Sequence, residues 1–547
     1  MLEPPGIETN SLRRASRRTG ARGGAVSALT FPCGAAEVAV GPDGTVTATL
    51  PGAAPTLLVT GGLLVHAADG RPLLPGPPEV RADEDEVELA WSTGALTLVV
   101  RHTFAVGWGL RVALSAGGEQ AIDLRDPLLT WRTPDDRPAW ALAAGAAGSY
   151  AVLPADGAGP LLGGVLRSGA LPAVDPAGLH LGPVRLAAGA RYVVQWQWDL
   201  HPGPRGLSRG RHPQVPRRLD LAVDEVVVVE ATEDEALVLP DGLEAEHARG
   251  QVELSGVQPG RYPVELRAAR GTTAYELRVG PPLETLLADR ALVALEQPRT
   301  AAGIVRLADG DAALAVQRAL AAAVLPDTEL AEEALDLHTA RLPDGDALDP
   351  RTVGYLCGEH TRTGDPALLE RAERAVLVAA SPEPGLGLAA TQLCLALLLA
   401  GRPVAPVLQH LAGLAAAADR RASAAPLVAQ ASLLELEVVT TARRGPADGA
   451  AGSVRVRERV AALGGWLGAG LTGRAVRPLP VDQLAHLCAV LALLPEPAAA
   501  VHRTRWGCTA HVLAAGGRVS VLERVAWDGG PEAGPALSWL LLGTRAD

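Results

Sequence analysis

Lysine is absent from this chain of 547 residues, so all 49 basic side chains are arginine. Asparagine occurs once, as Asn10. Without a lysine amine the chain cannot form a Schiff base, anchor pyridoxal phosphate or supply the phosphate-binding lysine of a Walker motif. The residues that GC-rich codons encode are abundant, so codon bias explains the pattern, but the missing side chains still exclude these enzyme classes.

Aromatic residues are also scarce, at 3% of the chain, so Leu, Val and Ala must build most of the core. A hydrophobic content of 48% and a charged content of 20% are typical of a folded globular protein. The net charge is −12, and the arginine cluster between Arg13 and Arg22 lies in a segment without apolar periodicity. We expect no nucleic-acid partner, because such a partner requires a basic face that neutralises phosphates.

Cysteine is the next scarce residue, with five in the chain. An odd and small number favours reduced thiols in a cytoplasmic protein over a disulfide framework. No secretion signal is apparent, and the strongest apolar run, Leu386 to Ala400, is short and contains Gln392. This run predicts a core helix, so we expect no membrane partner.

From about Val26 to Val279, apolar and polar residues alternate as in half-buried β-strands. In the clearest strand, one face carries Tyr192, Val194, Trp196, Trp198 and Leu200. This face is either an aromatic platform for a sugar ring or a sheet face packed on a second sheet, and we favour the second interpretation. The alternation predicts an N-terminal antiparallel β-sandwich over residues 26–200, after a disordered tail or mis-annotated start over 1–25. A linker over 201–218 then leads to a small sandwich, or a continuation of the first, over 219–280.

Gly280-Pro281-Pro282 marks a change to helical periodicity. We predict an α/α-hairpin helical domain over residues 281–514 and a C-terminal β-hairpin over 515–547. Asp327, Asp349 and Asp365 are the predicted N-caps of three helices, and the last two precede a proline.

One helical hairpin is more distinctive. Residues from Tyr355 to Ala372 read as a helix, the turn Thr363-Gly364-Asp365-Pro366 and a second helix. This unit resembles the hairpins of six-hairpin (α/α toroid) carbohydrate-active proteins. A β-sandwich ahead of such a toroid is similar to the layout of glucoamylase-like and disaccharide-phosphorylase-like enzymes. The resemblance implies a toroid-like helical domain and carbohydrate recognition or processing in the cleft between the two domains.

Carboxylates are the first candidates for chemistry, because glycoside hydrolysis uses two of them about 5–10 Å apart. Asp344 and Asp346 precede the helix predicted from Pro350 to His360, and Glu359 lies at its end. If the protein is an enzyme, we expect a glycoside-hydrolase-like reaction with Glu359, Asp346 and Asp344 as catalytic residues. The alternative is that these are solvated loop charges and helix caps.

A repeated spacing gives the metal candidates, Cys357-x-x-His360 and Cys508-x-x-His511. Residues i and i+3 share one face of a helix, so each pair could offer two ligands to zinc. The alternative is that buried thiols and packed imidazoles explain both pairs, in which case no cofactor is expected. Two further hypotheses therefore accompany the carbohydrate hypothesis. One is a non-catalytic scaffold or protein-interaction protein with a degenerate toroid and an unidentified protein partner, and the other is a zinc-binding helical domain.

Overall fold

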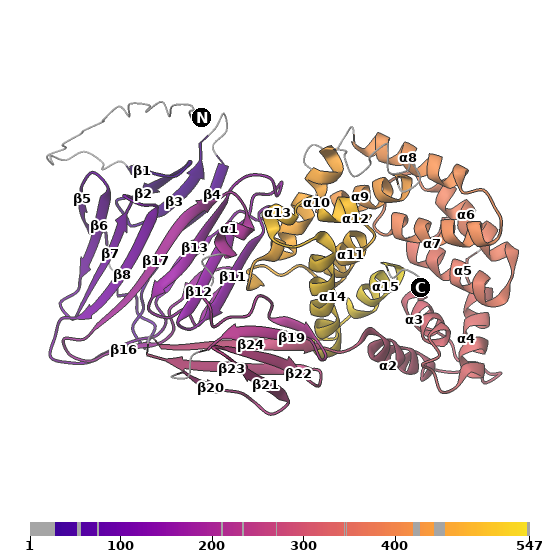
Figure 1. Cartoon of the computed structure of the whole chain (residues 1–547), viewed down its shortest axis with the longest axis horizontal. Coiled ribbons are helices and arrows are strands. Elements are labelled where there is room, and N and C mark those ends of the chain that lie inside the picture. The colour runs from indigo at the N-terminus through magenta and orange to yellow at the C-terminus, as the bar shows by residue number, and fades with distance from the viewer. Residues whose placement is uncertain are drawn as a thin grey trace.

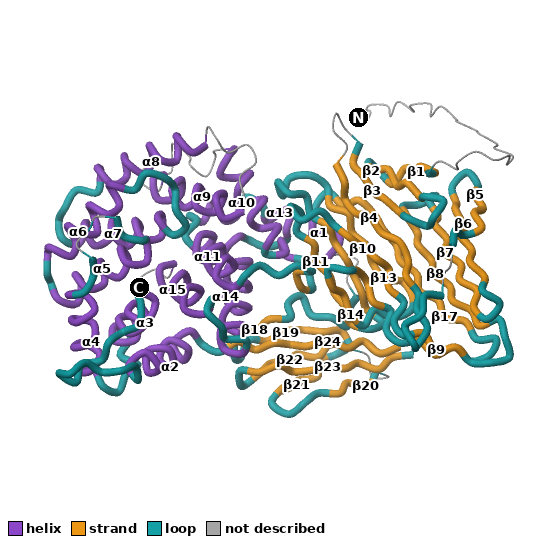
Figure 2. The backbone as a smooth tube through the Cα atoms, turned by 180° about the vertical axis from the view of Figure 1, so that it is seen from behind, coloured by secondary structure: helices purple, strands orange, loops and turns teal. Residues whose placement is uncertain are grey.

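The predicted order of a β-rich part followed by a helical part is confirmed (Figures 1 and 2). The computed structural model describes residues 28–51, 56–73, 76–208, 212–231, 235–269, 271–343, 345, 347–419, 427–441 and 454–543. The tail or mis-annotated start predicted for residues 1–25 lies outside this range.

Among the described residues, two large antiparallel sheets form the first part of the chain. The first sheet runs, in spatial order, β1 (Leu29–Cys33), β2 (Ala36–Val40), β3 (Val46–Leu50), β4 (Thr56–Leu64), β10 (Leu128–Arg132), β15 (Gly178–His180) and β14 (Ala173–Asp175). The second runs β25 (Arg474–Ala475), β11 (Ala139–Ala144), β12 (Ala147–Val152), β13 (Leu161–Ser168), β17 (Arg191–His201), β8 (Trp108–Ala116), β7 (Leu96–Thr103), β6 (Glu86–Ser92) and β5 (Glu79–Ala82). A short pair, β9 (Ile122–Leu124) and β16 (Val184–Leu186), lies beside them. The inner faces of both large sheets share one apolar core.

Tryptophan side chains occupy the middle of this core. Trp196 and Trp198 of β17 are fully buried, and Trp198 stacks on Trp131 of the opposite sheet with ring centroids 4.7 Å apart. Trp108 lies 5.7 Å from Trp198. The favoured interpretation of the aromatic face is therefore correct: these rings join two sheets and are closed to a sugar.

Two smaller sheets follow helix α1 (Pro204–Ser208) and share a core of their own. One contains β18 (Asp220–Ala222), β24 (Gly271–Gly280), β23 (Gly260–Ala268) and β20 (Ala236–Val238), and the other contains β19 (Val226–Glu230), β22 (Gln251–Gly256) and β21 (Leu243–Ala248). Strands β18 and β24 are parallel, whereas the other pairs described here are antiparallel. Leu142 and Ala144 of β11 also enter this core, so it packs directly against the large sandwich.

Apart from the short strand β25, the regular structure of the rest of the described chain is helical, and several helices begin at a capping residue. Asp309, Asp327, Asp349 and Asp365 each accept a hydrogen bond from a backbone N–H of the first turn, which confirms the three predicted caps. The helices are α2 (Leu283–Leu295), α3 (Gly310–Ala321), α4 (Thr328–Ala340), α5 (Pro350–Thr363), α6 (Pro366–Val378), α7 (Leu386–Leu399), α8 (Ala405–Asp419), α9 (Leu427–Thr441), α10 (Val454–Trp466), α11 (Val481–Ala492), α12 (Glu496–Ala500), α13 (Arg503–Trp506), α14 (Ala510–Trp527) and α15 (Ala533–Gly543).

The helices make contacts in a closed circuit. Helix α3 contacts α5, and the series continues through α7, α9, α11 and α15 back to α3. These are the inner helices, and α2, α4, α6, α8, α10 and α14 pack around them. Figure 1 shows α15 well inside the helical half, with α4, α6 and α8 at its periphery. Because α3, α5 and α7 are successive members of this circuit, residues of their first turns can lie close together at one end of it.

The predicted C-terminal β-hairpin is wrong, because this segment is helical. Helix α14 continues to Trp527, and α15 follows after a short turn. Val521, Leu522 and Val525 are buried at positions i, i+1 and i+4, which is helical spacing. The valines in this segment suggested a strand, but packing against neighbouring helices overrides such local preferences.

An apolar core joins the β-rich half of the molecule to the helical half. Leu153 and Leu161 of the large sandwich pack with Leu434, Leu463 and Leu487 of the helices. An ion pair also joins the small sheets to α14. Glu523 of α14 is 1% exposed and lies 2.6 Å from Nε of Arg261 on β23. The two-residue strand β25 leaves the helical half and pairs with β11 of the sandwich.

No single helix among the described residues is long and apolar enough to cross a membrane. One pair, Val481–Ala492 with Glu496–Trp506, reaches that length and composition only when its two parts, bent by 114°, are taken together.

Candidate functional site

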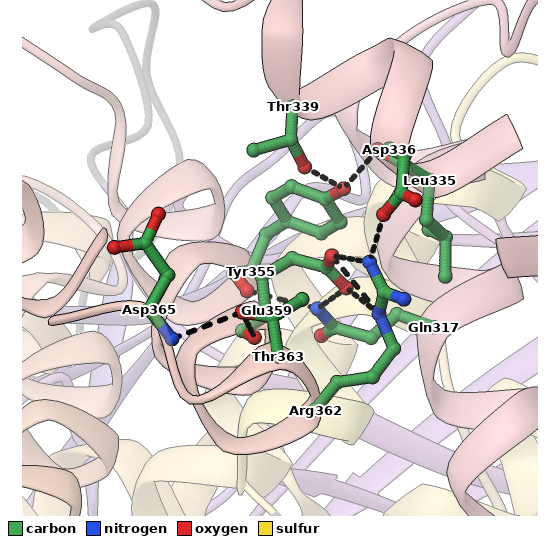
Figure 3. Close-up of polar contacts among 9 residues, drawn as sticks. All are labelled: Gln317, Leu335, Asp336, Thr339, Tyr355, Glu359, Arg362, Thr363 and Asp365. Carbon is green, nitrogen blue, oxygen red and sulfur yellow. Dashed lines mark hydrogen bonds and ion pairs between the residues drawn. The ribbon is translucent and has the colours of Figure 1, made fainter. Parts of the chain in front are cut away.

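Glu359, the first predicted catalytic residue, lies on a buried face of α5 in a network of polar contacts (Figure 3). Its side chain is 0% exposed. Arg362 Nη2 lies 2.5 Å from Glu359 Oε2, and Gln317 Nε2 donates to Glu359 Oε1 at 2.7 Å. Arg362 also contacts Asp336 Oδ1 of α4 at 2.5 Å. Both carboxylate oxygens of Glu359 are thus occupied, and the arrangement favours a structural ion pair between helices.

The pKa shifts around Glu359 agree with this role. Burial disfavours the charge of Arg362, but its hydrogen bonds to Glu359 and Asp336 outweigh burial and raise the pKa of Arg362. Burial and the nearby Glu359 carboxylate raise the pKa of Tyr355, whose hydroxyl lies 2.8 Å from Thr339 Oγ1. Both groups therefore keep their ordinary protonation states. The other predicted catalytic residues, Asp344 and Asp346, lie outside the described residues.

The predicted zinc ligands are not brought together. Burial raises the pKa of the Cys357 thiol to about 12, which opposes the thiolate that zinc requires. His360 Nδ1 lies 2.8 Å from the carbonyl oxygen of Asp365, and His511 Nε2 lies 2.7 Å from that of Leu494. Burial raises the pKa of the Cys508 thiol as well. Within the described part of the chain, no group of three or more His, Cys, Asp or Glu side chains is arranged to hold a metal ion.

A different set of polar residues converges where the inner helices begin. We call it the ring-end cluster, and its members are Asp311, Arg351, Glu435, His486, Ser538 and Trp539. Asp311 and Arg351 lie in the first turns of α3 and α5, each two residues after its cap, Asp309 or Asp349.

The exposed part of the ring-end cluster is an ion pair. Arg351 Nη1 lies 2.9 Å from both carboxylate oxygens of Asp311, and Arg351 Nε lies 3.5 Å from Asp349 Oδ1. Ser538 Oγ of α15 donates to Asp311 Oδ1 at 2.8 Å. The Arg351 side chain is 30% exposed, and its Nη2 makes no hydrogen bond to any residue that the structure describes. One edge of this guanidinium is therefore available to an anion.

Burial raises the pKa of the Asp311 carboxyl, and the nearby charges of Asp309 and Asp349 act in the same direction. The hydrogen bond from Ser538 and the charge of Arg351 oppose this shift without cancelling it. A carboxylate with a raised pKa is a stronger base than an ordinary aspartate, which is a common property of catalytic bases.

Trp539 of α15 lies beneath this ion pair. The guanidinium carbon of Arg351 is 5.5 Å from the centroid of the indole ring, within the range of a cation–π contact. The His486 ring of α11 lies 5.2 Å from the same indole at an angle of 52°. Gly385, with φ +86°, gives the indole its space, because a Cβ there would lie 2.1 Å from the ring.

Glu435 of α9 anchors the deepest part of the ring-end cluster. It is 0% exposed, and its carboxylate pairs with His486 Nε2. It also accepts hydrogen bonds from the backbone N–H groups of Gly385, Gly387 and Leu388 at 3.1, 2.9 and 3.2 Å. The side chain thereby caps α7, whose N-cap Gly385 has no side chain of its own for this purpose. Each inner helix of the circuit thus contributes to one continuous set of contacts.

Sequence reasoning missed this cluster. Ser538 and Trp539 were predicted to lie in a β-hairpin, Asp349 was predicted as a helix cap, and neither Asp311 nor Arg351 was predicted as a site residue. The available signal was the pair of motifs Asp309-x-Asp311 and Asp349-x-Arg351, which place a charge in the first turn behind a capping aspartate.

Comparison with known proteins gives a likeness of fold. No protein-family model matches the chain, and no curated protein matches it. The solved structure of a polysaccharide lyase matches with a TM-score of 0.68 and 12% sequence identity, over 94% of this chain and 100% of that chain. YidC from Thermotoga maritima matches with a TM-score of 0.20 and 14% identity, over 35% of this chain and 55% of that chain. The chain therefore shares its overall fold with the first of these solved structures.

Proposed function

We propose that this protein binds and processes an anionic polysaccharide at the ring-end cluster, with Arg351 as the anchor for a carboxylate. The free edge of the Arg351 guanidinium carries this proposal. The Nη2 group of Arg351 can donate a charge-assisted hydrogen bond to a carboxylate oxygen. The carbohydrate class is taken from the name of the solved polysaccharide lyase that shares the fold. The closed circuit of helices is also the arrangement that the resemblance to α/α toroids implies.

The reaction that these groups suit is elimination next to a uronate carboxylate. Pairing with Arg351 would neutralise that carboxylate and make the hydrogen on the adjacent ring carbon more acidic. Asp311, whose pKa is raised by burial, would accept that proton. The new double bond forms as the bond to the leaving sugar oxygen breaks, and that oxygen takes a proton from water. Hydrolysis, the reaction expected from the sequence, would add water instead and leave no double bond.

The alternative of a binding protein without catalysis also has an observation behind it. Glu435, His486 and Trp539 are 0%, 3% and 9% exposed, so only the Arg351 side of the ring-end cluster reaches solvent. A protein that only recognises acidic sugars needs no more than this surface.

Calorimetric titration with acidic and neutral oligosaccharides, together with ultraviolet detection of unsaturated uronate, tests both forms of the proposal. Arg351→Gln should lower affinity for the acidic ligand about tenfold or more. Arg402→Gln is a matched control, because Arg402 is 33% exposed and pairs with one carboxylate, Glu373. Equal loss in both variants, or unchanged affinity in Arg351→Gln, would refute the site. Saturated products would identify hydrolysis, and binding without any product would favour the binding protein.

A further inference from the structure

A cavity of about 260 Å³ opens beside the start of α15. Its walls come from the beginning of α11, the end of α14 and the turn between α14 and α15, and they comprise Val481, Arg524, Asp528, Gly529, Pro531 and Glu532. None of these residues belongs to the ring-end cluster.

The polar groups of this cavity are held in place. Arg524 Nη1 donates to the carbonyl oxygen of Leu479 at 2.8 Å. Asp528 Oδ1 accepts from Arg261 Nη2 at 2.9 Å, and Glu532 Oε2 accepts from the Val481 N–H at 3.2 Å. Each of these three lining side chains is thus held by a hydrogen bond. The wall thus carries two carboxylates, Asp528 and Glu532, and one guanidinium group, Arg524.

An exposed aromatic side chain, Trp527, lies on α14 next to two residues of the cavity wall, Arg524 and Asp528. Trp527 is 44% exposed, the most exposed of the described tryptophans, in a chain that buries most of its few aromatic rings. Arg524 and Trp527 of α14 and the C-cap Asp528 are at i, i+3 and i+4, so their side chains share one side of the helix. An exposed indole face can stack on the apolar C–H face of a sugar ring while neighbouring polar groups bind its hydroxyls.

The cavity lies at the same end of the circuit as the ion pair of Asp311 and Arg351. A Cβ on Gly534 would lie 3.5 Å from Asp311, so the first turn of α15 touches this carboxylate residue. Glu532 on the cavity wall lies just before α15, and Ser538, which donates to Asp311, lies about 9 Å further along the helix at 1.5 Å per residue. One oligosaccharide could therefore reach both places.

We infer that this cavity is a subsite for a neutral sugar unit, next to the place where Arg351 binds an acidic one. The inference rests on the proposed function and adds a substrate class, a polysaccharide that contains both neutral and acidic units. A uronate in the cavity would face the carboxylates of Asp528 and Glu532, whereas the hydroxyls of a neutral sugar can donate to these carboxylates and accept from Arg524.

The test is calorimetric titration of the full-length protein with oligomers of equal length. The probes are hyaluronan fragments, in which glucuronate alternates with a neutral amino sugar, all-acidic oligogalacturonate and all-neutral cello-oligosaccharide. The variants are Trp527→Ala, its conservative counterpart Trp527→Phe, Arg524→Gln and the control Trp91→Ala, at a partly exposed tryptophan on β6 of the sandwich.

We expect the hyaluronan fragment to bind more tightly than oligogalacturonate. Trp527→Ala and Arg524→Gln should each weaken hyaluronan binding about tenfold and leave oligogalacturonate binding almost unchanged. Trp527→Phe should retain most of the wild-type affinity for hyaluronan. Equal affinity of wild type and Trp527→Ala for the hyaluronan fragment would overturn the subsite while leaving the role of Arg351 intact. If Arg351→Gln binds both acidic probes as well as wild type, the proposed function fails instead. Binding of none of the probes by the wild-type protein would overturn both.

Discussion

The guanidinium carbon of Arg351 lies 5.5 Å from the centre of the Trp539 indole. Trp539 belongs to α15, which begins more than 180 residues after Arg351 in the chain. The indole supports the cation from below without competing for its hydrogen-bond donors.

Replacement of Trp539 by leucine should therefore weaken acidic-ligand binding by about threefold to tenfold, since a cation–π contact contributes about 1 kcal/mol. Trp539→Phe keeps an aromatic face and should retain most of the affinity. Calorimetric titration measures both variants after their folding is checked by circular dichroism. Full affinity in a folded Trp539→Leu variant would contradict the supporting role of the indole.

Asp311→Asn should separate binding from chemistry. The carboxylate competes with an acidic ligand for the Arg351 guanidinium, so its removal should tighten ligand binding. If Asp311 is the proton acceptor, the same variant should lose product formation by about 100-fold or more.

The pH profile gives a second readout for Asp311. Because its pKa is raised, the wild-type rate should fall as pH decreases through that raised value, where the base becomes protonated. If Asp311→Asn keeps the wild-type rate and the wild-type pH profile, Asp311 is not the base.

Glu359→Gln tests the residue that the sequence favoured for catalysis. We expect a loss of about 2–3 kcal/mol in the free energy of unfolding, because the half-buried Arg362 would lose the charge of its fully buried partner Glu359. Ligand binding and turnover of the folded fraction should be unchanged. Denaturant titration provides the measurement, with the exposed Glu370→Gln on α6 as control. Complete loss of turnover in a stably folded Glu359→Gln protein would restore the catalytic interpretation.

His102 should make the large sandwich sensitive to acid. Burial lowers its pKa from 6.5 to about 4, and Trp108 Nε1 donates to its Nδ1 at 3.1 Å. As pH falls below 6.5, the unfolded chain takes up a proton that the folded chain accepts only near pH 4. The free energy of unfolding should therefore decrease by about 3 kcal/mol across this window. In His102→Gln this decrease should be absent, and an identical pH dependence in both proteins would show that His102 is not its source.

Local interactions explain which features the sequence predicts. The caps Asp327, Asp349 and Asp365 depend on backbone N–H groups two or three residues away, so the sequence alone locates them. The alternation of β17 likewise predicts its buried face. The predicted end of α5 at His360 was one turn short, because the helix continues to Thr363 and its last turn includes Arg362, the partner of Glu359.

The ring-end cluster could not be predicted in the same way. Asp311 and Ser538 are hydrogen-bonded across 227 positions, and Glu435 caps a helix about 50 residues earlier. These contacts arise only when the circuit of helices closes. The strand-like pattern of the last segment predicted a β-hairpin there, so Ser538 and Trp539 were not predicted to lie in a helical site.

Strand β25 has a consequence for how the chain can be divided. Arg474 and Ala475 supply the hydrogen-bonding partners for the outer edge of β11. A fragment that ended before the helices would leave that edge open as a template for intermolecular strand addition. The helical half therefore protects the β-rich half against self-association, and we expect the truncated fragment to form aggregates where the intact chain stays monodisperse.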